Sequence, residues 1–113
     1  MTEVLKAITA SGLGSFLAVI KVFGDAVSPG TMSFPVPGIT LALDFPIRRE
    51  VSFALLDRLA DITADFGGRM YPAKDACMSA THFQQFYPLW QQFSVYVDPA
   101  FSSSFWQRVT GLD

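Results

Sequence analysis

The sequence predicts an α+β fold: a small antiparallel sheet with helices packed on one face, followed by a helical C-terminal tail. Two β-rich apolar runs, 15–23 and 39–45, are separated by a loop rich in proline and glycine. An amphipathic helical pattern covers 51–66, and shorter helical patterns follow it. Because the loop is too short for a helical crossover, the two strands are predicted to be antiparallel. At 113 residues, we expect a single domain over 1–113.

The first two elements are a helix and a strand. Residues 2–10 are expected to form a short helix that Thr2 caps and Ser11-Gly12 ends. The run 15–23 contains Phe-Leu-Ala-Val-Ile-Lys-Val-Phe without polar alternation. This pattern predicts a strand that is covered on both faces.

The second strand, 39–45, alternates strictly. One face is large and apolar and is predicted to be core, namely Ile39, Leu41, Leu43 and Phe45. The other face is small and polar, with Thr40, Ala42 and Asp44. Such a face suits the wall of a pocket, although an ordinary solvent face has the same pattern. Pro46 ends the strand.

The remaining elements are mostly helical. In the helix 51–66, apolar positions recur at helical spacing and are predicted to face the core: Leu55, Leu59, Ile62 and Phe66. Gly67-Gly68 ends this helix. Residues 69–71 are predicted as a third short strand that Pro72 closes. A helix over 79–87, an apolar segment to 97 and a serine-capped helix over 103–109 complete the chain.

The composition is unusually apolar for a small domain. Hydrophobic residues make up 50% and charged residues 16%, whereas soluble domains carry about 25% charged residues. We therefore expect self-association, or a surface that lies against a partner. The net charge of −2 and the lack of a basic cluster argue against nucleic acid as a partner. No apolar run is long enough for a membrane span, and no secretory signal is visible. With one cysteine, these features favour a cytoplasmic location.

Few side chains suggest chemistry on their own. We interpret His82 as a surface or helix-start histidine and Cys77 as a small filler, and one residue of each type is too few for a zinc site. The aromatic run Phe83 to Phe93 has helical spacing and is interpreted as core or interface. Two lysines are less easily explained. Lys21 interrupts an apolar strand, where a charge is costly unless it is paired or faces a polar site, and Lys74 follows the predicted third strand. For each lysine alone, a structural salt bridge is the simpler reading.

Five segments in matching order resemble the C-terminal region of the vanillyl-alcohol-oxidase-type FAD-linked oxidases: 14–24, 43–47, 66–75, 86–88 and 97–99. The third of these segments is Phe-Gly-Gly-Arg-Met-Tyr-Pro-Ala-Lys-Asp over 66–75. The resemblance implies the end of a substrate (cap) domain, with the FAD-binding domain absent from this chain. It also implies FAD as cofactor of the complete enzyme and a sugar-type substrate.

The resemblance also implies site residues. Lys74 corresponds to a lysine that reaches both flavin and substrate, and Tyr71 to the tyrosine of the same cofactor-binding motif. The substrate-binding positions are Lys21, Phe23, Thr40 and Ala42. Some members of the family carry asparagine in place of Thr40 and cysteine in place of Ala42, which leaves the substrate open. An ammonium such as that of Lys74 can stabilise the negative charge that develops on a flavin during alcohol oxidation.

These inferences leave three readings. The first is a fragment or subunit of an FAD-dependent oxidoreductase acting on a sugar or sugar-phosphate hydroxyl, inactive without its flavin domain. The second is a free-standing, self-associating α/β binding module without catalysis. The third is a member resembling the aldonolactone oxidases, with a different substrate.

Overall fold

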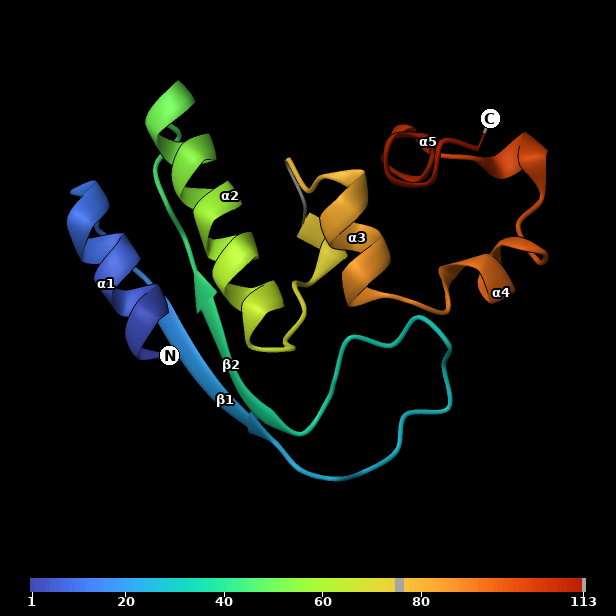
Figure 1. Cartoon of the computed structure of the whole chain (residues 1–113), viewed down its shortest axis with the longest axis horizontal. Helices are drawn as coiled ribbons and strands as arrows, with labels where there is room; N and C mark the ends of the chain where they lie inside the picture. Colours follow the sequence, from blue (N-terminus) through green and yellow to red (C-terminus); the bar gives the residue numbers. More distant parts are fainter. Residues whose placement is uncertain (75–76, 113) are drawn as a thin grey trace.

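The computed structural model describes residues 1–74 and 77–112; the side chains of Arg49 and Lys74 lie outside the described part. The elements follow one another along the chain in Figure 1. They are α1 (Thr2–Ser11), β1 (Ala18–Phe23), β2 (Gly38–Leu43), α2 (Arg49–Asp65), the 3₁₀ turn η1 (Pro72–Lys74), α3 (Ala80–Phe86), α4 (Trp90–Ser94), η2 (Pro99–Phe101) and α5 (Ser104–Thr110).

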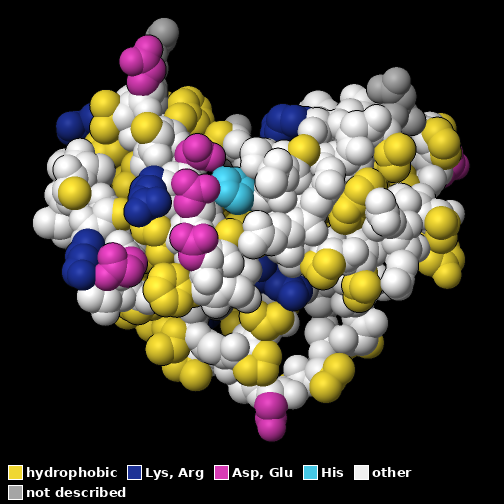
Figure 2. Space-filling model, in the orientation of Figure 1, with side chains coloured by type: hydrophobic (Ala, Val, Ile, Leu, Met, Phe, Trp, Pro, Cys, Tyr) yellow, Lys and Arg dark blue, Asp and Glu magenta, His cyan; other side chains and the backbone are white. Residues whose placement is uncertain are grey.

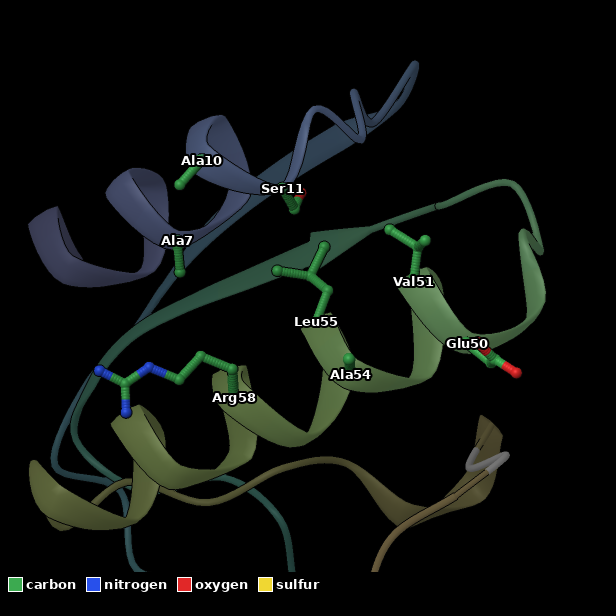
Figure 3. A pocket seen from close by; sticks show the side chains of 8 residues that line it. All are labelled: Ala7, Ala10, Ser11, Glu50, Val51, Ala54, Leu55 and Arg58. Carbon is green, nitrogen blue, oxygen red and sulfur yellow. The ribbon is translucent and has the colours of Figure 1, made fainter.

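The two strands form an antiparallel ribbon. Ala18 lies opposite Leu43 at one end, and Phe23 lies opposite Gly38 at the other. Helices α1 and α2 pack against each other on the same side of this ribbon, and the shorter helices α3 to α5 follow beside α2 (Figures 1 and 3). The predicted α+β class, with helices on one face of a small sheet and a helical tail, is confirmed.

A smaller core cluster joins the N-terminal elements. Leu13, Leu55 and Leu59 are buried together, and Phe45 packs against them. The connection from β2 to α2 is fixed by the buried Ser52, whose hydroxyl donates to the Pro46 carbonyl at 2.9 Å and accepts from the Arg48 N–H at 2.8 Å. The predicted core positions Leu55 and Leu59 are therefore confirmed, as is Ile62, which is also buried.

A larger core cluster joins α2, α3 and α5. Its buried members are Ala60, Met78, Phe83, Phe86, Tyr87 and Val109. The ring of Phe83 makes edge-on contacts with Phe105 and Trp106, at centroid distances of 5.6 and 6.1 Å. Phe83, Phe86 and Tyr87 of the aromatic run are thus core, as the spacing predicted, whereas Trp90 is half-buried and Phe93 is 38% exposed. Such a core holds the C-terminal helices together although each has at most seven residues.

Three helix ends agree with capping residues in the sequence, but the predicted Thr2 cap is wrong, because Thr2 lies inside α1 and no side chain caps its N-terminus. Gly12 ends α1 in the left-handed conformation, with φ of 67°. The hydroxyls of Ser79 and Ser103 accept the N–H groups of His82 and Trp106 and cap α3 and α5. These boundaries lie within two residues of the predicted ones.

Two strand predictions are wrong. Residues 69–71 are not in a strand, because side chains rather than a sheet ladder hold this segment: the Tyr87 hydroxyl donates to the Met70 carbonyl at 2.8 Å. The strand β1 is not covered on both faces. Ile20 is 65% and Val22 is 76% exposed although Ile20 lies opposite the half-buried Leu41, because the helices leave this end of the two-stranded ribbon uncovered.

Three single-residue predictions are also wrong. Ile39 lies opposite Val22 at the uncovered end of the ribbon and is 60% exposed. Phe66 follows the last residue of α2, so its side chain lies beyond the helix and is 76% exposed. Cys77 is exposed rather than a buried filler. In the part of the chain that the structure describes, no helix is long and apolar enough to cross a bilayer.

Candidate functional site

The hairpin register brings the four predicted substrate-side residues onto one face. Lys21 lies directly opposite Thr40, and Val19 lies opposite Ala42. Phe23, two residues after Lys21, projects to the same side because side chains alternate along a strand. Opposite residues on one face of an antiparallel pair have Cβ atoms about 5 Å apart. Lys21 and Thr40 can therefore contact one ligand together.

This face is directed away from the smaller core cluster. Leu41 and Leu43 belong to the opposite face and are half-buried, and Phe45, two residues further, packs against Leu55 and Leu59. On the candidate face, Lys21 and Ala42 are exposed and Thr40 is half-buried. The small and polar side of β2 is therefore accessible to a ligand.

The charge of Lys21 is not neutralised by any carboxylate in the described part of the chain. Among residues 1–74 and 77–112, no carboxylate pairs with its ammonium, so the structural salt bridge considered above is not present in that part of the chain. An exposed ammonium beside a threonine hydroxyl offers hydrogen-bond donors and, through the hydroxyl, an acceptor. This combination suits the hydroxyl groups or a negative charge of a ligand.

An aromatic bridge connects this face to the segment after α2. The ring of Phe34 lies 6.2 Å from that of Phe23 and 5.2 Å from that of Tyr71, measured between centroids. Tyr71 is 56% exposed. The structure therefore brings Tyr71 close to the end of the candidate face through Phe34, a residue that the sequence alone did not single out.

Lys74 ends the 3₁₀ turn η1 rather than a third strand. Its side chain lies outside the described part of the chain, so the expected direction of its ammonium stays a prediction. Its backbone follows Tyr71 by three residues, which places η1 directly after the aromatic bridge.

His82 lies at a helix start, as predicted, and is half-buried at the surface. Its side chain is only 12% exposed; Nε2 lies 3.1 Å from Asp61 Oδ1 and Nδ1 lies 3.0 Å from Ser79 Oγ. The ring also stacks on Phe86 at 5.8 Å. Figure 2 shows the histidine beside acidic side chains in the middle of the visible face. Since Ser79 caps α3 and Asp61 belongs to α2, this cluster joins two helices.

Arg69 forms a second polar cluster that sequence reasoning missed. Its Nη1 donates to the Ser33 carbonyl at 2.8 Å, and its guanidinium lies 5.4 Å from the centroid of the Tyr87 ring. Burial raises the pKa of Tyr87 to about 12, and the nearby Arg69 charge opposes that rise. The Gly-Gly-Arg motif contains Arg69, but the contact with Ser33 could not be predicted from it, because Ser33 lies 36 residues earlier in the chain.

A groove also lies between α1 and α2. Small side chains of the two helices face each other across it, including Ala7, Ala10 and Ala54, with Arg58 and Glu50 at opposite ends (Figure 3). Its lining contains one cation and one carboxylate, which lie at opposite ends. None of the residues predicted for the site lines this groove.

The expected resemblance to the FAD-linked oxidases rests on the sequence motifs. No family model matches the sequence. A curated protein confirms the resemblance: decaprenylphosphoryl-beta-D-ribose oxidase of Mycolicibacterium smegmatis (strain ATCC 700084 / mc(2)155) is 36% identical over 100 residues. Those residues are 86% of this chain and 21% of the oxidase.

A second curated protein is also similar. The "uncharacterized protein in mprA 5'region" of Streptomyces coelicolor is 32% identical over 93 residues, which are 82% of this chain and 25% of that protein. The chain therefore spans between a fifth and a quarter of the length of these two relatives.

Proposed function

We propose that this chain forms the substrate-side portion of an FAD-dependent oxidoreductase that oxidises a hydroxyl of a sugar or sugar phosphate. The observation that carries the proposal is the common hairpin face of Lys21, Phe23, Thr40 and Ala42. The 36% identity to an oxidase of a ribose derivative supports it. The remainder of such an enzyme would be supplied by a further domain or subunit.

The hairpin residues have distinct roles in this proposal. The Lys21 ammonium and the Thr40 hydroxyl bind hydroxyl or phosphoryl oxygens of the substrate and fix its orientation. Ala42 contributes only a methyl group, which leaves room above the ribbon. Phe23 closes the end of the face through its contact with Phe34, and this apolar edge limits access of water to the bound sugar.

The residues after α2 fit a role beside the flavin. An exposed tyrosine followed within three residues by a lysine offers an aromatic surface and a cation, which suit the isoalloxazine ring and its electron-rich edge. The flavin, when bound, supplies the chemistry by accepting a hydride from the substrate carbon. Tyr71 and Lys74 hold and orient that partner, and a flavin-binding domain is needed because the described residues contain no glycine-rich phosphate loop.

A second candidate is the self-associating binding module. The observation in its favour is the uncovered apolar end of the ribbon, where Ile20, Val22 and Ile39 are each at least 60% exposed. Such a patch favours association with another protein surface. It is compatible with either a second copy or the remainder of an oxidase.

A chimera tests the leading proposal. The matched 100 residues of the Mycolicibacterium smegmatis oxidase are replaced by this chain, and flavin reduction by the oxidase's substrate is followed without oxygen. We expect reduction in the chimera and a rate lower by roughly 10²–10³ in Lys21→Gln, the loss seen when one preorganised donor is removed.

Lys6→Gln is the matched control. Lys6 is an exposed lysine on α1 that pairs with Glu3 at 2.8 Å, away from the hairpin face. We expect the rate of this variant to equal that of the unsubstituted chimera. Equal rates for Lys21→Gln and Lys6→Gln would show that the hairpin face has no part in the reaction.

A further inference from the structure

A polar groove lies where the loop between β1 and β2 meets the segment after α2. Its polar lining residues are Ser28, Thr31, Ser33, Arg69 and Gln92. The groove therefore combines one guanidinium, three hydroxyls and one carboxamide. The proposed function does not assign a role to any of these five residues.

The loop side of the groove is internally fixed. The Ser33 N–H donates to the Gly30 carbonyl at 3.1 Å, which closes a tight turn, and the Ser28 hydroxyl donates to the Ser33 Oγ. A Cβ at Gly30 would lie 2.7 Å from Ser33 Oγ, so only glycine fits without a shift. Because Ser33 Oγ accepts the bond from Ser28, its own proton is left to donate to a ligand.

Arg69 is the charged member of the groove. It is half-buried, and among the described residues its guanidinium donates one hydrogen bond, from Nη1 to the Ser33 carbonyl. Within residues 1–74 and 77–112, no carboxylate forms an ion pair with it. A guanidinium has five N–H donors in a planar fork, so most of its donor capacity is available on the groove side. Its contact with the Tyr87 ring fixes the plane of the fork.

This arrangement has the chemistry of an oxyanion site. A half-buried cation without a carboxylate partner attracts an anion more strongly than an exposed one, because water screens it less. The planar fork matches two oxygens of a phosphoryl group, and hydroxyls and a carboxamide can donate to the others. This mixture of donors favours an anion over an apolar ligand.

We propose that this groove binds a phosphoryl group, with the Arg69 guanidinium and the Ser33 hydroxyl as its main donors. The identity of the biological ligand rests on the proposed function. In that function, the phosphoryl group belongs to a sugar-phosphate substrate. The groove lies next to the aromatic bridge, because Ser33 precedes Phe34 and Arg69 lies two residues before Tyr71. It therefore adjoins the candidate face without including Lys21 or Thr40.

The test uses the chain itself and needs no flavin. Binding of inorganic phosphate, ribose 5-phosphate and ribose is measured by calorimetry and by NMR shift changes at constant ionic strength. We expect both phosphates to bind and to shift the Ser33 and Arg69 signals, and ribose to leave these signals unchanged. Arg69→Gln should weaken phosphate binding at least tenfold, and Ser33→Ala about threefold.

Matched variants distinguish a specific phosphate site from a general effect of positive charge and from misfolding. Arg58→Gln removes an arginine that lines the other groove, so phosphate affinity should not change. Ser33→Ala keeps the carbonyl that Arg69 contacts, and Arg69→Lys keeps the charge but not the fork, so both should fold and bind more weakly. Unchanged affinity in Ser33→Ala and Arg69→Lys, or an equal loss in Arg58→Gln, would overturn the proposal. Because no oxidase activity is read, failure of the oxidase proposal would leave this result intact.

Discussion

Tyr87→Phe is the substitution whose effect the structure defines most fully. Tyr87 is 1% exposed, and its hydroxyl donates to the Met70 carbonyl at 2.8 Å. Replacing it with phenylalanine keeps the ring in the larger core cluster but leaves a buried carbonyl without its donor. At neutral pH we expect the free energy of unfolding to fall by about 1 kcal/mol.

The same residue predicts a pH dependence. Burial raises the pKa of Tyr87 to about 12 in the folded state, against a value near 10 for an unfolded tyrosine. The contribution of the neutral Tyr87 side chain to the free energy of unfolding is therefore fully present below about pH 10 and is lost as the pH rises through about 12. Two units of pKa correspond to about 3 kcal/mol of stability in total, of which about 2 kcal/mol is lost between pH 10 and 12.

Urea unfolding at pH 8, 10, 11 and 12 measures both effects. The unsubstituted chain should lose more stability between pH 10 and 12 than Tyr87→Phe, by about 2 kcal/mol. Tyr96→Phe is the control, because Tyr96 is 84% exposed and its removal should leave the alkaline loss unchanged. Parallel alkaline curves for the unsubstituted chain and Tyr87→Phe would refute the reasoning.

Three further predictions concern the core, the ribbon and the flavin side. Phe83→Ala should cost about 3–5 kcal/mol in urea unfolding, because the side chain is 1% exposed, whereas Phe101→Ala, at 84% exposed, should change little. Ile20→Lys should reduce self-association in sedimentation experiments, since a charge on the uncovered ribbon opposes apolar contact; an unchanged mass distribution would contradict this. In the chimera, Lys74→Ala should raise the barrier to flavin reduction by about 2.7–4 kcal/mol, and an unchanged rate would remove Lys74 from the site.

Local signals predicted the helices and the hairpin well. The Ser79 and Ser103 caps, the Gly12 stop and the periodicity of Leu55, Leu59 and Ile62 all depend on residues close together in the chain. The alternation in 39–45 separated the face of Thr40 and Ala42 from the half-buried face of Leu41 and Leu43, and the register confirms that separation.

The predictions that failed involve contacts between segments that are distant in the chain. Residues 69–71 have the composition of a strand, but the Tyr87 hydroxyl and the Ser33 carbonyl hold them instead. The apolar run in β1 predicted cover on both faces, whereas Ile20 and Val22 are exposed, because hydrophobicity alone does not say what covers a surface. The contact of His82 with Asp61 was not predicted, because Asp61 lies 21 residues earlier in the chain.

The reach of the resemblance also has a physical limit. Motif matches carry residue identities, and the register then shows that Lys21, Phe23, Thr40 and Ala42 share a face. The motif matches do not define the ligand, because Thr40 and Ala42 stand where some members of the family have asparagine and cysteine. A threonine hydroxyl both donates and accepts, and alanine removes a polarisable thiol, so the substrate-side chemistry has to be measured directly.

The most direct test of the central claim is flavin reduction in the chimera that carries this chain in place of the matched segment of the Mycolicibacterium smegmatis oxidase. Under anaerobic conditions, the flavin absorbance is followed after addition of a ribose-type substrate. If the chain is the substrate-side portion of an FAD-dependent oxidoreductase, the absorbance falls with a rate that saturates with substrate and depends on Lys21. A folded, flavin-loaded chimera whose absorbance does not change with any sugar or sugar phosphate would contradict the claim.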